Sequence, residues 1–241
     1  MTRLNTELLP FSEQSAKKAA EIMAAGGVVG IPTETVYGLA ADARNEAAVR
    51  SIFEAKGRPQ DNPLIVHISA LEQLPPLVRE IPELALKIAE KYWPGPLTMI
   101  FPKSDMIPSA TSGGLDTVAV RMPESPAARA IIDACGFPLA APSANLSGSP
   151  SPTTAQHVMN DMNGRIPLII DGGECRCGVE STVLCFPAAD RVRILRPGGV
   201  TAEMLSELCQ TDIDPAVTSE PPKGAKVMSP GMKYKHYAPK A

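Results

Sequence analysis

Two pairs of polar residues are the first candidates for chemistry in this sequence. Lys56 and Arg58 flank Gly57 where a helix is predicted to end, and Ser143 and Asn145 follow a short apolar strand. The helix dipole offers an ordinary explanation for the two cations, and a polar loop offers one for the hydroxyl and the amide. Together, however, Lys, Arg, Ser and Asn donors can hold an anion without a covalent nucleophile. Phosphoryl and nucleotidyl transfer need mainly positioning and charge neutralisation, which such a set can supply.

More polar residues follow predicted strands, where α/β folds place ligand sites. Thr33, Glu34 and Thr35 come directly after the apolar segment 28–31, although a hydroxyl-rich turn would explain them equally well. Residues 178–182 and 195–199 form similar polar loops at strand ends. These segments are further candidates for the same site.

The sequence lacks the motifs of several common enzyme classes. It contains no Walker A loop, no G-x-G-x-x-G after a strand, no H-E-x-x-H and no G-x-S-x-G. Its three histidines are far apart, and Cys175 and Cys177 have the wrong spacing for a zinc knuckle. We therefore expect no metal ion held directly by a cluster of side chains.

The elements that must position these residues are read from apolar spacing and capping residues. Helices are predicted over 12–25, from Asn45, over 81–92, from Ser125, and from Thr201 to about Cys209. Strands are predicted at 28–31, 64–68, 97–101, 117–121, 139–141, 168–170, 182–184 and 192–195. Because strands and helices interleave, we expect an α/β fold: one domain with a twisted mixed β-sheet of about seven strands flanked by helices.

Composition and charge exclude some classes of function. The 241 residues include 23 Lys and Arg against 26 Asp and Glu, which excludes a chain-wide basic coat for nucleic acid. Residues 221–241 are the exception, with five lysines and no acidic residue. An odd number of cysteines, no secretory signal and no apolar run of membrane-spanning length favour a cytoplasmic protein that does not enter a membrane.

Longer segments carry a resemblance to a known family. PTETVYGLAADA, KGRPQDNPLIVH, YWPGPLTMI, VAVRMP and APSANLSG occur in this order between about Gly26 and Gly199. With Lys56-x-Arg58 and Ser143-x-Asn145, they resemble the YrdC-like family of threonylcarbamoyl-AMP synthases. The later segment SPGMKYKHYAP resembles the linker of longer members, in which a small Rossmann-like domain follows. By this resemblance we expect a YrdC-like catalytic domain over 1–211, a linker or lid over 212–241, and no C-terminal Rossmann-like domain.

The resemblance implies a reaction and its participants. L-threonine, bicarbonate and ATP, with Mg²⁺, would give threonylcarbamoyl-AMP and pyrophosphate. A tRNA threonylcarbamoyl transferase complex would then pass the group to the tRNA adenosine beside the anticodon. The implied catalytic residues are Lys56, Arg58, Ser143 and Asn145. The residues implied for threonine are Thr35, His67, Arg121, Ala141 and Ser181, and those implied for ATP are Arg58, Asn62, Thr117, Ser143, Ser151, Arg196 and Tyr234.

Three alternatives remain open at this point. His67 shares a strand face with Ile65, so it could be a core histidine rather than a ligand. The chain could be a module that grips double-stranded RNA or tRNA, for which its near-neutral charge leaves only weak contact through the lysine-rich tail. It could also be a carbamoyl-transfer relative, since the same fold occurs in proteins that process carbamoyl phosphate.

Overall fold

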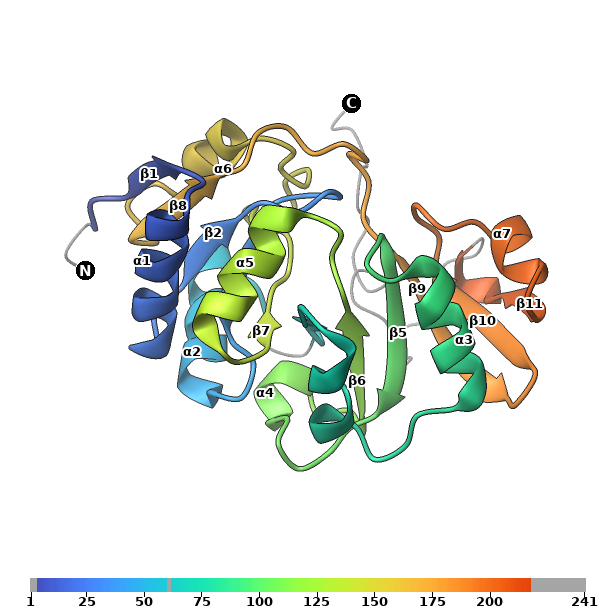
Figure 1. Ribbon diagram of the computed structural model, residues 1–241. Helices are drawn as coiled ribbons and strands as arrows, with labels where there is room; N and C mark the ends of the chain where they lie inside the picture. The colour runs from blue at the N-terminus through green and yellow to red at the C-terminus, as the bar shows by residue number, and fades with distance from the viewer. Residues whose placement is uncertain (1–3, 60–61, 218–241) are drawn as a thin grey trace.

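A computed structural model describes residues 4–59 and 62–217 (Figure 1). The helices are α1 (Glu13–Ala24), α2 (Glu46–Lys56), α3 (Glu83–Tyr92), α4 (Ser109–Ser112), α5 (Pro126–Cys135), α6 (Ala155–Met162) and α7 (Ala202–Ser206), with 3-10 turns η1 (Leu71–Gln73), η2 (Pro75–Leu77) and η3 (Pro215–Val217). The strands are β1 (Glu7–Pro10), β2 (Val29–Ile31), β3 (Gly38–Asp42), β4 (Ile65–His67), β5 (Leu97–Pro102), β6 (Thr117–Arg121), β7 (Leu139–Ala140), β8 (Leu168–Asp171), β9 (Thr182–Ala188), β10 (Arg191–Arg196) and β11 (Gln210–Ile213).

Helices begin where short polar side chains can accept hydrogen bonds from the first free backbone amides. Ser12 forms a capping box with Ser15 at the start of α1, and the Asn45 side chain accepts from two backbone amides at the start of α2. Ser125 and Thr201 cap α5 and α7, so the four predicted starts are confirmed. The predicted end of the last helix at about residue 209 is wrong, because α7 ends at residue 206 and the chain turns into β11.

The strands form one mixed sheet in the order β1-β8-β2-β3-β7-β4-β6-β5-β9-β10-β11. The prediction of an α/β fold with a twisted mixed sheet is confirmed, but seven strands is too few. Strand β3 is rich in glycine and alanine, which have low strand propensity, and β11 is a short polar edge strand, so neither stands out in the sequence. Strand β11 pairs with β10 and straddles the predicted boundary between residues 211 and 212.

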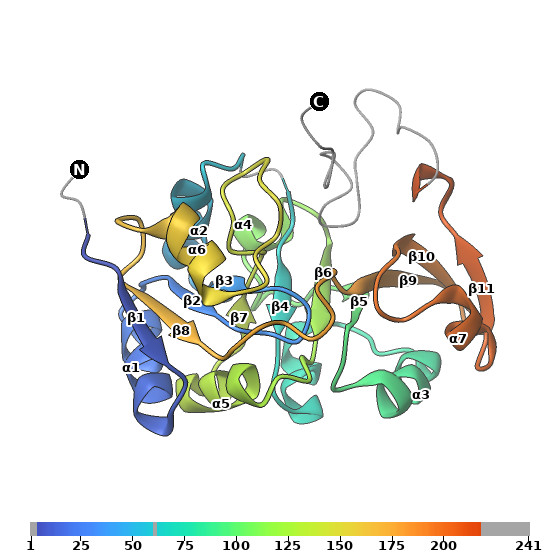
Figure 2. The ribbon, with the colours of Figure 1, turned by 90° about the horizontal axis from the view of Figure 1, so that it is seen from above.

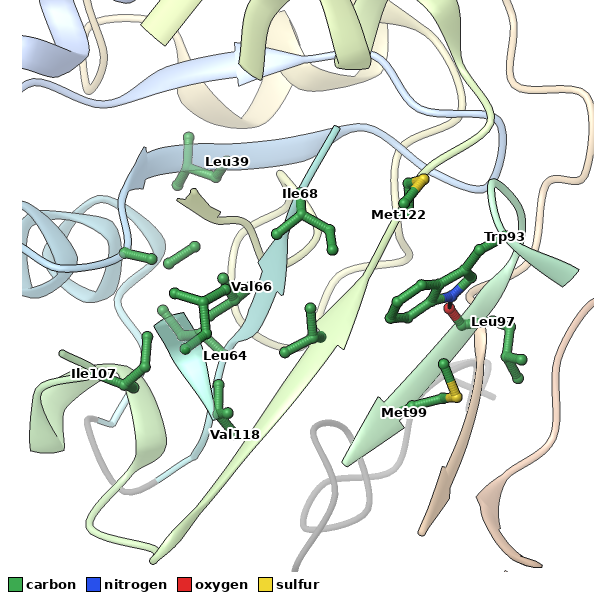
Figure 3. Packing of buried hydrophobic residues seen from close by; sticks show 14 of the residues in the cluster. Leu39, Leu64, Val66, Ile68, Trp93, Leu97, Met99, Ile107, Val118 and Met122 are labelled. Carbon is green, nitrogen blue, oxygen red and sulfur yellow. Dashed lines mark hydrogen bonds between the residues drawn. The ribbon is translucent and has the colours of Figure 1, made fainter. Parts of the chain in front are cut away.

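Helices cover the sheet from both sides (Figure 2). Helices α1 and α5 pack on one side over an apolar cluster from β2, β7 and β8, whereas α2 and α6 lie on the other side. The larger cluster fills that second side and extends to α3 and β5. Figure 3 shows part of it, in which Trp93 packs near Met99 and donates from Nε1 to the carbonyl of Leu97 (2.7 Å). This packing supports the strands from which the polar residues project.

On β6, side chains alternate between the two faces of the sheet. Val118 and Val120 enter the larger cluster, so Thr117, Ala119 and Arg121 share the opposite face. A small apolar cluster lies on that opposite face. It comprises Ile65, Ile100, Ala119, Val183 and Leu195. One face of the sheet therefore carries an apolar strip with Arg121 at one end and Thr117 at the other.

The helices of the described part of the chain are too short or too polar to span a bilayer.

Candidate active site

A cleft with about 580 Å³ of empty space, counting the part open to solvent, lies where β2, β4, β6 and β7 end. Eight of the predicted site residues line it: Thr35, Arg58, His67, Arg121, Ala141, Ser143, Ser181 and Arg196. They come from segments that are far apart in the sequence, and the sheet order brings them together. The cleft is therefore the candidate active site.

Arg121 stands at the end of β6 with its guanidinium held on three sides. Its Nη2 pairs with Oε1 of Glu34 (2.5 Å), Nη1 donates to Oγ1 of Thr35 (2.8 Å), and Nε donates to the carbonyl of Gly95 (3.2 Å). Burial opposes ionisation of Glu34, but the charge and hydrogen bond of Arg121 outweigh it and hold the pKa of that carboxyl below its usual value. Each terminal guanidinium nitrogen carries a second hydrogen, which these three contacts do not use.

His67 lies on β4 directly beside Arg121 on β6. It is buried, and its Nδ1 lies 3.3 Å from the carbonyl oxygen of Ile65. Burial, reinforced by the positive charge of Arg121, lowers the pKa of His67 to about 3, so the ring is neutral at physiological pH. Because it also lines the cleft, His67 is both a buried histidine and a residue that a ligand can reach.

Lys56 does not line the cleft as far as the described residues define it. Its side chain is buried, and Nζ donates to the carbonyls of Ser143 and Asn145, the second at 2.7 Å. Burial, together with the nearby charge of Arg58, lowers the pKa of Lys56 to about 7. Lys56 thus holds the backbone of the loop that carries Ser143, while Arg58, two residues later, reaches the cleft itself.

The loop after β7 is held from three sides. Ser143 forms an isolated bridge with Gly38, and the amide of Ala144 donates to the carbonyl of Tyr37 (2.8 Å). The side-chain oxygen of Asn145 accepts from the Ser143 hydroxyl (2.5 Å), and Asn145 itself is buried. Asn145 therefore orients Ser143, and Ser143 is the member of this pair that faces the cleft.

The Ser181 side chain contacts Thr98 on β5 and Arg196 at the end of β10. Its hydroxyl lies 2.7 Å from that of Thr98, and it accepts from Nη2 of Arg196 (3.1 Å). Nε and Nη2 of Arg196 also donate to the Ser181 carbonyl (3.1 and 2.9 Å). The position of Arg196 is thus coupled to that of Ser181.

The remaining predicted residues lie outside the cleft lining. Thr117 is at the far end of the apolar strip and lines a separate groove beside Phe186, and Ser151 donates to Glu180, which does line the cleft (2.7 Å). The Asn62 side-chain nitrogen is buried and has no hydrogen-bond partner within the described part of the chain. Tyr234 lies outside the described residues.

Sequence reasoning missed Thr98, which contacts Ser181. It named Glu34 and the segment 178–182, which contains Glu180, as candidates without giving them a role. In the structure Glu34 compensates the charge of Arg121, and Glu180 lines the cleft. No feature of the sequence marked Thr98 as functional, because it is one residue of an otherwise apolar strand.

Guanidinium and hydroxyl groups line the cleft, and Ile65 joins it to the small apolar cluster on the same face of the sheet. No group of three or more His, Cys, Asp or Glu side chains that could hold a metal ion occurs among residues 4–59 and 62–217. Such a cleft can bind anions and neutralise charge during group transfer.

Two family models match the chain. The Sua5–YciO–YrdC model, described as "Telomere recombination", matches residues 21–198, and one described as "Threonylcarbamoyl-AMP synthase, C-terminal domain" matches residues 200–241. The chain is 53% identical to a threonylcarbamoyl-AMP synthase of Pyrococcus abyssi, over 96% of this chain and 67% of that protein. It is 49% identical to one of Bacillus subtilis, over 98% of this chain and 68% of that protein.

A solved structure is similar to this chain in both fold and sequence. The crystal structure of P. abyssi Sua5 complexed with L-threonine matches with a TM-score of 0.91 at 50% identity, over 99% of this chain and 69% of that chain. The chain thus spans about two thirds of the length of each of these matches.

Proposed function

Because this chain belongs to the Sua5–YciO–YrdC family and is a transferase of the threonylcarbamoyl-AMP synthase type, we propose that its cleft condenses L-threonine, bicarbonate and ATP to threonylcarbamoyl-AMP and pyrophosphate. The observation that carries the proposal is the meeting of Arg121, Thr35 and His67 with Arg58, Ser143 and Arg196 around one cleft. The first three suit an amino acid, and the other three suit a polyphosphate.

The amino acid binds at the Arg121 end. The second hydrogens of the two terminal nitrogens of Arg121 hold the threonine carboxylate as a bidentate pair. Ser181 and the backbone of Ala141 complete this end of the cleft. The P. abyssi structure complexed with L-threonine supports this choice of ligand, because that protein has the same fold and is 50% identical to this chain.

The nucleotide binds along the rest of the cleft. Arg58, Ser143 and Arg196 hold the phosphates, with Ser151 beside them through Glu180. The apolar strip from Ile65 to Ile100, whose side chains are buried, leads away from these residues toward Thr117, and we place the purine base beside it because apolar side chains suit a base. The Asn62 nitrogen, which is buried and has no partner among residues 4–59 and 62–217, supports a ligand near this residue, because a buried donor without a partner is costly.

Mg²⁺ enters with ATP as part of the substrate. It would be held mainly by phosphate oxygens and water, as is usual for this ion with nucleotides. The hydroxyl groups and the carboxylate of Glu180 at the cleft are suitable oxygen donors for its remaining positions.

The reaction consists of two bond-forming steps. The threonine amine attacks the carbon of bicarbonate, so that a C–N bond forms and water leaves, and the product is a carbamate. A carbamate oxygen then attacks the α-phosphorus of ATP, and the bond between the α-phosphorus and the bridging oxygen breaks to release pyrophosphate. The participants are anionic, so the role of Arg58, Arg196 and Lys56 is charge neutralisation, directly for the first two and through the Ser143 loop for Lys56. Alignment of carbamate and nucleotide supplies much of the acceleration, of the order of 7–11 kcal/mol in well-oriented systems.

The product is a labile mixed anhydride, so water must be excluded after it forms. We assign this role to the segment 212–241, with Tyr234 against the nucleotide. A tRNA threonylcarbamoyl transferase complex would consume the product in the cytoplasm, and the lysine-rich tail permits weak contact with tRNA.

The test is pyrophosphate release with ATP, Mg²⁺ and bicarbonate while the amino acid is varied. We expect release that requires both bicarbonate and L-threonine, and about a hundredfold loss in Arg58→Ala. Lys17→Ala, on the exposed face of α1, is the matched control and should keep full activity. Steeply salt-dependent RNA binding without threonine-dependent turnover would contradict the proposal and favour an RNA-binding module. Turnover of carbamoyl phosphate in place of bicarbonate would favour a carbamoyl-transfer relative.

A further inference from the structure

The hydroxyl groups of Thr33 and Thr35 form a short chain of hydrogen bonds beside Arg121. Arg121 Nη1 donates to Thr35 Oγ1 (2.8 Å), and Thr35 Oγ1 lies 2.9 Å from Thr33 Oγ1. Thr33 Oγ1 donates to the carbonyl of Val36 (2.6 Å) and accepts from the amides of Thr35 and Val36 (3.2 Å each). Both threonines are buried.

These bonds leave one direction for the proton of Thr35. A hydroxyl has one hydrogen, and a carbonyl oxygen can only accept. The Thr33 hydrogen is used on Val36, so we assign the hydrogen between the two hydroxyls to Thr35, which donates it to Thr33. Thr33 Oγ1 then shares its lone pairs between this bond and the two longer bonds from the amides of Thr35 and Val36. Arg121 takes one lone pair of Thr35 Oγ1. What Thr35 can still offer the cleft is its other lone pair, which is a hydrogen-bond acceptor.

Like Thr35, His67 presents a hydrogen-bond acceptor to the cleft. The ring interacts with the carbonyls of Ile65 and Leu139, and since Nδ1 lies 3.3 Å from the Ile65 oxygen, we assign the hydrogen of the neutral ring to Nδ1. The ring is buried and neutral, and the other nitrogen, Nε2, therefore bears a lone pair. Strand register places His67 beside Arg121, to which Thr35 is bonded, and all three line the cleft.

We propose that Thr33 is a positioning residue that keeps the Thr35 hydroxyl an acceptor, so that this end of the cleft offers two acceptors, Thr35 Oγ1 and His67 Nε2, next to the Arg121 guanidinium. This inference rests on the proposed function for the identity of the ligand. It adds the rule by which the site selects that ligand: a carboxylate must be accompanied by N–H or O–H donors. A second acceptor on the ligand would face lone pairs and leave buried groups unpaired.

L-threonine satisfies this rule with its amine and its hydroxyl. The amine also has to lose a proton when the C–N bond forms, and an acceptor beside it favours the orientation in which its lone pair points away from the protein. Two analogues separate the two donors: L-2-aminobutyrate lacks the hydroxyl, and 3-hydroxybutyrate lacks the amine.

The experiment compares the full chain with Thr33→Val and Thr33→Ser. Thr33→Val keeps the size of the side chain and removes its hydroxyl, whereas Thr33→Ser keeps the hydroxyl. Calorimetric titration of the three ligands should show that Thr33→Val reduces the preference for threonine over at least one analogue by about tenfold, the size of one net hydrogen bond. Thr33→Ser should retain that preference. In steady-state assays the KM for threonine should rise about tenfold in Thr33→Val while kcat changes by less than about twofold.

Thr6→Val controls for the general effect of removing a buried hydroxyl. Thr6 bonds to Ile166 and Gly164, which are not among the residues that line the cleft. This variant should keep the ligand preference unchanged. An equal loss of affinity for all three ligands in Thr33→Val, or the same behaviour in Thr33→Ser, would assign Thr33 a purely structural role and overturn the inference.

A neutron crystal structure of the ligand-free chain gives a test that does not depend on the reaction. The inference requires a deuteron on Nδ1 of His67 and the Thr35 deuteron directed at Thr33. If these positions are found but pyrophosphate release does not depend on threonine, the proposed function fails and the polarity of the site stands. If turnover depends on threonine but either deuteron lies elsewhere, the inference fails and the proposed function stands.

Discussion

Arg121 and Glu34 form an ion pair whose two side chains are only 4% and 6% exposed, with 2.5 Å between Nη2 and Oε1. The pair joins the end of β6 to the loop after β2, and the second Glu34 oxygen accepts from the amide of Ser125 ahead of α5 (3.3 Å). Buried charges persist only when they are paired and hydrogen-bonded. The cation proposed to bind the substrate carboxylate is thus compensated and oriented before any ligand arrives.

Breaking this pair should destabilise the fold strongly. Glu34→Leu leaves the Arg121 guanidinium buried and uncompensated, and we expect the free energy of unfolding in urea to fall by about 3–5 kcal/mol. The double variant Glu34→Leu, Arg121→Met should recover part of that loss while it remains inactive. Glu13→Ala, which removes an exposed ion pair on α1, serves as the control and should hardly shift the unfolding midpoint. A Glu34→Leu protein as stable as the original would contradict the buried pair.

The neutral His67 should make stability depend on pH. In the unfolded chain a histidine takes up a proton near pH 6.5, whereas the pKa of folded His67 is about 3. Between these values the unfolded state binds more protons, so the free energy of unfolding should fall as the pH falls, by up to about 1.4 kcal/mol per pH unit.

Urea unfolding at pH 6, 5.5 and 5 measures this slope below the range in which Lys56 loses its proton and above the range in which Glu34 titrates. His67→Gln should flatten the slope, and His157→Gln, on the exposed surface of α6, should keep it. An equal slope in His67→Gln would mean that His67 is not the group responsible. Below about pH 4.5 the lowered pKa of Glu34 adds a second loss of stability in the same direction.

Lys56 and Arg58 should respond differently to substitution. Lys56→Met removes the donor to the carbonyls of Ser143 and Asn145, and each unsatisfied buried carbonyl costs about 1–3 kcal/mol. We therefore expect Lys56→Met to lower both stability and activity. Arg58→Ala should lower activity with a smaller change in stability, because its side chain is only partly buried. Thermal unfolding measured beside pyrophosphate release separates the two roles, and a Lys56→Met protein of unchanged stability would refute the loop-holding role.

Ser181 should couple the two ends of the cleft. Its hydroxyl lies between Thr98 and Arg196, and its carbonyl accepts from the same guanidinium. If a non-hydrolysable ATP analogue raises the affinity for threonine, Ser181→Ala should reduce that enhancement about fivefold. Thr98→Val keeps the contact between Ser181 and Arg196, and it should retain most of the coupling. Equal coupling in Ser181→Ala and the unmodified chain would rule out coupling of the two sites through Ser181.

Local signals predicted much of the fold. The capping residues Ser12, Asn45, Ser125 and Thr201 marked helix starts correctly, because a cap acts on backbone amides two or three residues away. Apolar runs located most strands for the same local reason. Three strands were missed. Strands β1 and β11 are short edge strands whose identity depends on their pairing with β8 and β10, and β3 consists largely of glycine and alanine.

For the candidate site, too, the sequence predicted some features and missed others. The motif segments were enough to predict the family. The fold places seven residues that this resemblance implied around one cleft: Thr35, Arg58, His67, Arg121, Ser143, Ser181 and Arg196. The partners of these residues could not be read from their spacing. Glu34 reaches Arg121 across 87 residues, and Lys56 turns to the carbonyls of a loop 87 to 89 residues away instead of facing the cleft. Such contacts follow from strand order and register, which long-range pairing sets, so only the tertiary structure decides which charges are compensated and which groups remain for a ligand.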